Sequence, residues 1–127
     1  MKQLTESRVN IDAYYTDNLF KNPEWALVWE DYVAFLKRQQ LFDASIAASK
    51  HAIAYHPNNP RLIIQYGLLM MEFGNPQNAV EIFTHMTEVM QNDSSAWMLL
   101  SKAHTIAGNQ DAAKEAFERG SSLQNKN

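Results

Sequence analysis

Residues of matching type recur along this chain at a spacing of thirty-four positions. The matched sets are Ala79 with Ala113, Phe83 with Phe117, Gly74 with Gly108, and Trp29 with Ile63 and Trp97. A fixed period of this size is typical of stacked helical repeats, in which no helix pair buries its apolar face without a neighbour. The period therefore predicts an all-α chain whose function lies on the surface of the stack.

Each period contains two segments with apolar residues at helical spacing. In the middle period one helix is expected from Pro60 to Gly74, because proline suits a first turn, and a second from about Pro76 to Gln91, with Asn75 as its cap. Upstream, Gln39-Gln40 is expected to form the turn before a second helix that carries Ile46, Ala47, Ile53 and Tyr55. The predicted units are 26–59, 60–93 and 94–127, and the last of them ends in a short polar tail, 121–127.

These residues resemble the tetratricopeptide repeat, whose pattern is W-x2-L-G-x2-Y, then A-x3-F, then a proline. The residues that carry the resemblance are Trp97, Leu100, Ala113 and Phe117 in the third unit, Tyr66, Gly67, Gly74, Ala79 and Phe83 in the second, and Trp29, Tyr32, Ala52 and Pro57 in the first. Serines at 45 and 49 replace the usual alanine and phenylalanine. The resemblance covers about 26–120 and implies a right-handed superhelical stack of antiparallel helix pairs, with about seven helices. Ala79, Ala113, Phe83 and Phe117 are expected in its core.

The two ends of the chain allow alternatives. Residues 1–25 are expected to form either a half-repeat helix from Asn10 to Asn22 or an arm that folds back along the groove. The half repeat would bury Ile11, Tyr14, Tyr15 and Leu19. At the other end no capping helix is evident, so a stripe around Ala116, Phe117 and Leu123 is expected to be exposed and available for self-association.

The composition excludes several classes of partner. Hydrophobic residues make up 46% and charged residues 20%, which is ordinary for one globular domain. Eleven basic side chains are scattered and the net charge is −3, so no basic patch suits nucleic acid. The N-terminus lacks the apolar run of a signal peptide, and no stretch approaches the roughly 20 apolar residues of a membrane span. We therefore expect a cytoplasmic protein with no membrane insertion, although an excised domain of an anchored protein would have the same features.

No group of residues points to catalysis. The chain has no cysteine, and its histidines, at 51, 56, 85 and 104, lack a ligand spacing such as H-E-x-x-H. It also has no phosphate loop and no nucleophile elbow. We therefore expect no enzymatic activity, no metal and no cofactor, and we expect His104, which replaces a core aromatic residue, to be a buried or half-buried packing residue.

The resemblance places the binding surface on the outward side of each unit's first helix. The family's groove positions imply partner contacts by Leu27, Glu30, Arg61, Ile64, Leu68, Met71, Met98, Lys102 and Ile106. Most of these residues form an apolar strip edged by charge, which is typical of partner sites. The alternative is that the N-terminal arm or tight packing already covers the strip. The residues needed for a carboxylate clamp are missing, which disfavours an adaptor for chaperone tails.

Two functions remain as hypotheses. The first is a protein-interaction module that binds a peptide or an amphipathic helix of another protein, as chaperones and assembly factors of bacterial secretion and pilus systems do. The second is a structural scaffold that self-assembles through its uncapped last helix.

Overall fold

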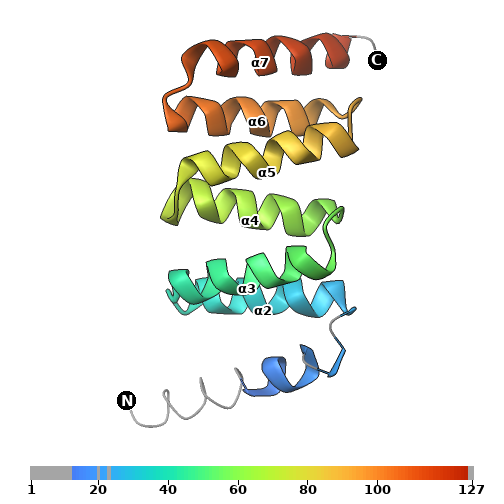
Figure 1. Cartoon of the computed structure of the whole chain (residues 1–127), viewed down its shortest axis with the longest axis vertical. Helices are drawn as coiled ribbons and strands as arrows, with labels where there is room; N and C mark the ends of the chain where they lie inside the picture. The colour runs from blue at the N-terminus through green and yellow to red at the C-terminus, as the bar shows by residue number, and fades with distance from the viewer. Residues whose placement is uncertain (1–12, 20, 23, 126–127) are drawn as a thin grey trace. The chain divides into compact units, whose positions relative to one another are not determined.

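All the secondary structure in the described part of the chain is helical. The computed structural model describes residues 13–19, 21–22 and 24–125 (Figure 1). Residues 13–19 are helical, and the helices that follow are α2 (Ala26–Arg38), α3 (Phe42–Tyr55), α4 (Pro60–Phe73), α5 (Pro76–Val89), α6 (Ser94–Ala107) and α7 (Gln110–Asn125). The prediction of an all-α fold is confirmed.

The helices begin at positions that keep the repeat spacing. The first helices of the three pairs begin at Ala26, Pro60 and Ser94, and the second helices begin at Phe42, Pro76 and Gln110. Each start therefore lies thirty-four residues after its equivalent. The chain divides into two compact units, Met1–Pro57 (unit 1) and Asn58–Asn127 (unit 2).

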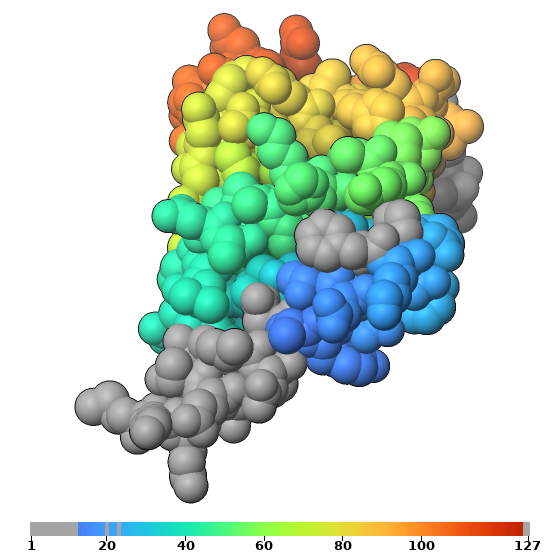
Figure 2. Space-filling view, turned by 60° about the horizontal axis from the view of Figure 1, so that its bottom comes forward, coloured from blue at the N-terminus to red at the C-terminus, as the bar shows by residue number. Residues whose placement is uncertain are grey.

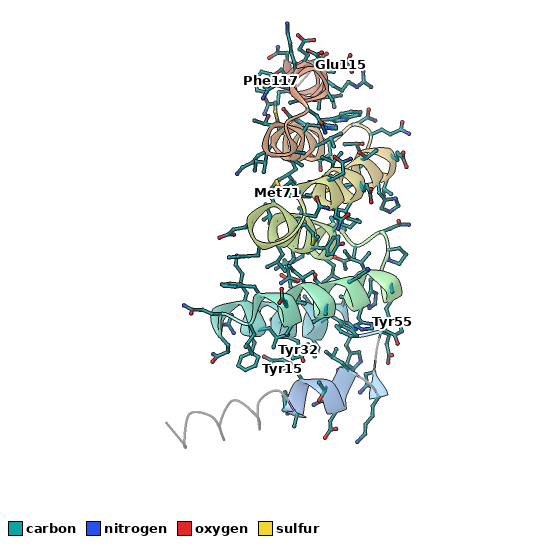
Figure 3. All side chains as sticks on the ribbon, turned by 60° about the vertical axis from the view of Figure 1, so that its left-hand side comes forward. Tyr15, Tyr32, Tyr55, Met71, Glu115 and Phe117 are labelled. Carbon is teal, nitrogen blue, oxygen red and sulfur yellow. The ribbon has the colours of Figure 1, made fainter. Side chains whose placement is uncertain are left out.

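In unit 1, α2 packs against α3 on one side and residues 13–19 on the other. Figure 2 shows the described residues before α2, in dark blue, lying against that helix. The ring of Tyr15 lies 5.4 Å from that of Tyr32, as Figure 3 shows, and 5.7 Å from that of Phe35. Leu19 is buried, whereas Tyr14 is exposed, so the expected inward face of this segment is only partly correct. Ile11 lies outside the described residues.

The buried face of α3 consists of small residues. The apolar side chains expected on the inward face of this helix are not its buried residues. Ala47 and Tyr55 are exposed, and Ile46 and Ile53 are only half-buried. The buried residues of α3 are instead Ser45, Ala48, Ser49 and Ala52. Small residues let two helix backbones approach closely, and Ser45 Oγ donates a hydrogen bond of 2.9 Å to the Val33 carbonyl, which satisfies its buried hydroxyl.

Unit 2 is a run of four helices in which each packs on the next. The contact between α4 and α5 depends on Gly67, because a Cβ there would lie 2.6 Å from Cε1 of Phe83 and would overlap its ring. The ring of Phe83 is fully buried beneath this glycine. Ala79 and Leu62 are also fully buried. The expectation that Phe83 and Ala79 form core is therefore confirmed.

Polar caps set the ends of these helices. The side chain of Asn75 accepts from the Gln77 amide at 2.9 Å, and Asp93 accepts from the Ser95 amide at 2.8 Å. At the end of α6, Gly108 takes a left-handed conformation with φ 87°, which glycine adopts without steric cost. The expected cap at Asn75 is therefore present.

The last helix differs from expectation in its length and in the burial of its apolar side chains. The segment expected to be a polar tail after residue 120 is helical to Asn125, and Leu123 is buried rather than exposed. Phe117 was expected in the core from its repeat position and on an exposed stripe from the uncapped end. It is 54% exposed, while its equivalent Phe83 is 0% exposed. Two physical reasons account for this: Ser101 replaces the glycine that makes room for Phe83, and within the described residues no helix follows α7 to cover its far side.

Candidate functional site

The apolar residues expected to bind a partner lie at the surface of unit 2. We define the α4–α6 strip as Ile64, Leu68, Met71, Met98 and Ile106. Leu68 is 38% exposed and Ile106 is 47% exposed, and the other three are half-buried. Figure 3 shows that α4 and α6 lie on the same side of α5, with Met71 between them. Packing within unit 2 therefore leaves the strip accessible.

Two basic side chains border the strip. Arg61 is exposed at the start of α4, and Lys102 is exposed in the middle of α6. Lys102 has no ion pair within the described part of the chain. An acidic side chain of a partner could therefore pair with it at the edge of the apolar surface.

Met98 lies at the boundary between the strip and α7. Its Cε would be 3.1 Å from a Cβ built on Gly120, so the glycine allows α7 to approach this side chain closely. Ser94 Oγ also donates to the Gly120 carbonyl at 3.0 Å and fixes the same contact. Met98 is thus partly used for internal packing, which leaves Leu68, Met71 and Ile106 as the more accessible part of the strip.

Two of the expected contact residues belong to unit 1. Leu27 is 68% exposed near the start of α2, and Glu30 is half-buried one turn later. Both residues belong to unit 1 and are not part of the α4–α6 strip.

Unit 1 also contains an aromatic recess that sequence reasoning missed. The ring of Trp29 stacks on Tyr55 at 5.8 Å and on His51 at 6.5 Å. A cavity of about 370 Å³ opens beside these rings, and its lining consists of Thr16, Leu19, Trp29, Tyr32, Ala44, Ala47, Ala48, His51 and Tyr55. Trp29 was identified only as a repeat position, and the exposed face of α3 carried no pattern that distinguishes a recess from ordinary surface.

Two histidines of unit 2 have structural partners. Nδ1 of His104 lies 3.1 Å from the amide nitrogen of Asn109, and Nε2 of His85 lies 3.1 Å from Oδ1 of Asn58. His104 is half-buried, as expected for a packing residue. Burial raises the pKa of the Tyr66 phenol, and the negative charge of Glu81 raises it further.

No catalytic or metal-binding arrangement is evident in the described ranges. Among these residues no three His, Asp or Glu side chains are grouped so as to hold a metal ion. Within the same part of the chain, every helix is too short or too polar to cross a bilayer.

Comparison with solved structures shows the same fold. One structure of the MamA protein is 23% identical in sequence with a TM-score of 0.68, and the match covers 77% of this chain and 54% of that chain. Another MamA structure is 16% identical with a TM-score of 0.73, and the match covers 96% of this chain and 72% of that one. This chain thus spans about half the length of the first of these proteins. No curated protein matches the sequence.

The sequence itself matches the tetratricopeptide repeat family over residues 36–103, which is more than half of the chain. Members of this family are generally interaction modules that bind other proteins. With the helix pairs that begin every thirty-four residues and the match across α3, α4 and α5, the chain belongs to the tetratricopeptide repeat family.

Proposed function

We propose that this chain is a non-enzymatic interaction module that binds a peptide or an amphipathic helix of another protein along the α4–α6 strip. The observation that carries the proposal is that Leu68, Met71 and Ile106 remain accessible although unit 2 has a complete core. Apolar side chains at a surface, edged by charge, favour a partner with an apolar face. Methionine suits such a surface because its flexible side chain adapts to different shapes.

The expected affinity is modest. Incomplete burial of a few apolar side chains returns several kcal/mol at about 25 cal/mol per Å². Association costs about 4 to 15 kcal/mol before any net affinity remains. We therefore expect dissociation constants in the micromolar range. The context we propose is a chaperone or assembly factor of a bacterial secretion or pilus system, in the cytoplasm.

The test compares captured partners between variants. Leu68→Glu combined with Met71→Glu places two charges on the strip and should abolish capture of a partner from native extract. Val89→Glu is the matched control, because Val89 is 44% exposed on the same unit but lies at the end of α5, away from the strip. Circular dichroism verifies that both variants are folded. Unchanged capture by the folded double variant would refute the proposal.

Self-association is a second candidate function, and one observation favours it. Phe117 is largely exposed, whereas the equivalent phenylalanine of the preceding helix pair is buried. Leu123 is buried, however, so a charge there would unfold the helix rather than separate copies. Light scattering of the wild-type chain over a range of concentrations tests this candidate, and a strictly monomeric protein would exclude it.

A further inference from the structure

The outward face of α7 carries one aromatic residue among polar ones. At about 100° per residue, one face of this helix carries Lys114, Phe117, Glu118 and Ser121, which we call the α7 face. Phe117 is exposed at its edge, and a shallow hollow beside the ring is lined by Phe117, Glu118, Ser121, Ser122 and Asn125. In Figure 3, Phe117 and Glu115 project to different sides of α7.

Comparison with the preceding pair indicates that most of this face is suited to packing. Of the four equivalent residues of α5, Val80, Phe83 and Thr87 are buried in a helix that packs on both α4 and α6, whereas Thr84, the equivalent of Glu118, is exposed. In α7 the corresponding positions hold Lys114, Phe117 and Ser121, and none of them is buried. The aromatic residue is thus retained where a further helix would pack, while Lys114 takes the place of the apolar Val80.

The charges on this face have no ion-pair partners among the described residues. Lys114 and Glu118 lie one turn apart on either side of the ring, and neither forms an ion pair within residues 13–125 that the structure describes. If two α7 helices pack antiparallel about a two-fold axis close to Phe117, each Lys114 lies opposite Glu118 of the second copy. The same operation brings the two phenylalanine rings together near the axis. The face is therefore complementary to itself in charge.

We propose that α7 mediates an isologous dimer, in which a second copy of this chain packs its α7 antiparallel on the first. The inference rests on self-association, the second candidate function, and is independent of binding at the α4–α6 strip. A two-fold contact of this kind closes on itself and does not propagate into a filament. Because one pair of helices buries less than the roughly 1,200 Å² of a standard interface, the dimer should be weak and reversible.

Sedimentation equilibrium of the full chain from about ten micromolar to about one millimolar measures this association. Phe117→Ala should raise the dimer dissociation constant about tenfold or more, because a central aromatic residue commonly dominates such contacts. Lys114→Glu should also weaken the dimer, because it places two carboxylates opposite each other. Glu115→Lys is the control: it changes an exposed charge on another side of the same helix and should leave the dissociation constant within about twofold.

Mixing two variants tests the antiparallel geometry directly. Lys114→Glu alone and Glu118→Lys alone each create like-charge contacts in a homodimer, so each should be mostly monomeric. An equimolar mixture should dimerise again, since each substituted residue then meets an opposite charge in the other variant. The double variant Lys114→Glu with Glu118→Lys should also dimerise.

The outcomes separate the inference from the function on which it rests. A wild-type chain that is monomeric at about one millimolar would overturn both self-association and the α7 contact. If the wild type dimerises but the α7 substitutions leave its dissociation constant unchanged, self-association is supported and the assignment of the interface to α7 is overturned. A dimer that is lost in the single charge variants and not recovered on mixing would overturn the antiparallel pairing.

Discussion

Phe83 and Phe117 occupy equivalent positions in successive helix pairs, yet their surroundings are opposite. Phe83 lies against Gly67 and is covered completely, whereas Phe117 belongs to a pair in which Ser101 takes the place of glycine. The hydroxymethyl group of Ser101 on the facing helix therefore contributes to whether the same residue type belongs to the core or to the surface. The position of an aromatic residue in the repeat does not by itself determine its burial.

Alanine substitutions at these two positions should have unequal effects. Phe83→Ala removes a fully buried ring and should lower the free energy of unfolding by about 3 to 5 kcal/mol. Phe117→Ala removes a mostly exposed ring and should change it by less than about 1 kcal/mol. Urea denaturation of the two variants at equal, low protein concentration measures the difference. Equal losses of stability would contradict the assigned burial.

Tyr66 gives a prediction about pH. Its pKa is raised above 10.0, first by burial and then by the charge of Glu81. Because folding favours the neutral phenol, the stability it provides is complete below the unfolded pKa and is lost as pH rises through the folded pKa. Unfolding free energies measured between about pH 8 and pH 11 should therefore fall more steeply above about pH 10 in the wild type than in Tyr66→Phe.

A second variant separates the two causes of this shift. Glu81→Gln removes the charge but leaves the ring half-buried, so the pH dependence should weaken without disappearing. Identical slopes above pH 10 in the wild type and in Tyr66→Phe would show that the phenol does not titrate differently in the folded chain.

Between elements, two serines make the same kind of contact in different helix pairs. Ser45 Oγ in α3 donates to the Val33 carbonyl in α2, and Ser101 Oγ in α6 donates to the Ala113 carbonyl in α7 at 2.7 Å. The donor is on the second helix in one pair and on the first helix in the other, but both bonds span twelve residues and join equivalent positions. In the middle pair these positions hold Gly67 and Ala79, and close packing takes the place of the hydrogen bond.

Removing either hydroxyl should loosen one helix pair. Ser45→Ala and Ser101→Ala each delete a buried hydrogen bond, and each should lower the free energy of unfolding by about 0.5 to 1.5 kcal/mol. Ser122→Ala is the control, because Ser122 is exposed on α7. Equilibrium denaturation of the three variants tests this expectation, and a neutral effect at both buried serines would contradict it.

These contacts also explain how far the sequence could predict the elements. The starts of α4 and α5 were predicted, because Pro60 and Pro76 with the cap residue Asn75 restrict the backbone directly. The inward face of α3 was not predicted, since its buried surface is made of serine and alanine, which carry little hydropathic signal. The extension of α7 to Asn125 was missed for a related reason: its inner face past residue 119 is formed by Gly120 and Leu123, among polar residues.

The same reasoning applies to the candidate site. The accessible strip on α4 and α6 could be predicted because the family's groove positions follow from the helix register, which the period determines. The recess of unit 1 could not, because it depends on how Trp29, His51 and Tyr55 stack across two helices. The exposure of Phe117 could not be predicted either, because it depends on which residue occupies the facing position of α6, Ser101 in this pair.

For the whole molecule, the division into two compact units has a consequence for cooperativity. In repeat proteins the stability is approximately a sum of terms within repeats and between neighbours, so damage in one region has mainly local effects. The fully buried ring of Phe83 is in unit 2, which extends from Asn58 to the C-terminus, and the ring contacts Gly67 of the same unit. A loss of this ring should therefore open unit 2 more than unit 1.

Hydrogen exchange of the Phe83→Ala variant tests this expectation. Amides of α4, α5 and α6 should lose protection by a factor of about 100 or more, which corresponds to a destabilisation of about 3 kcal/mol, whereas amides of α2 and α3 should lose much less. Phe117→Ala serves as the control and should leave both units protected, since its ring is mostly exposed. An equal loss of protection in α2 and in α5 would mean that the whole chain unfolds as one cooperative body, and the local account of its stability would then be wrong.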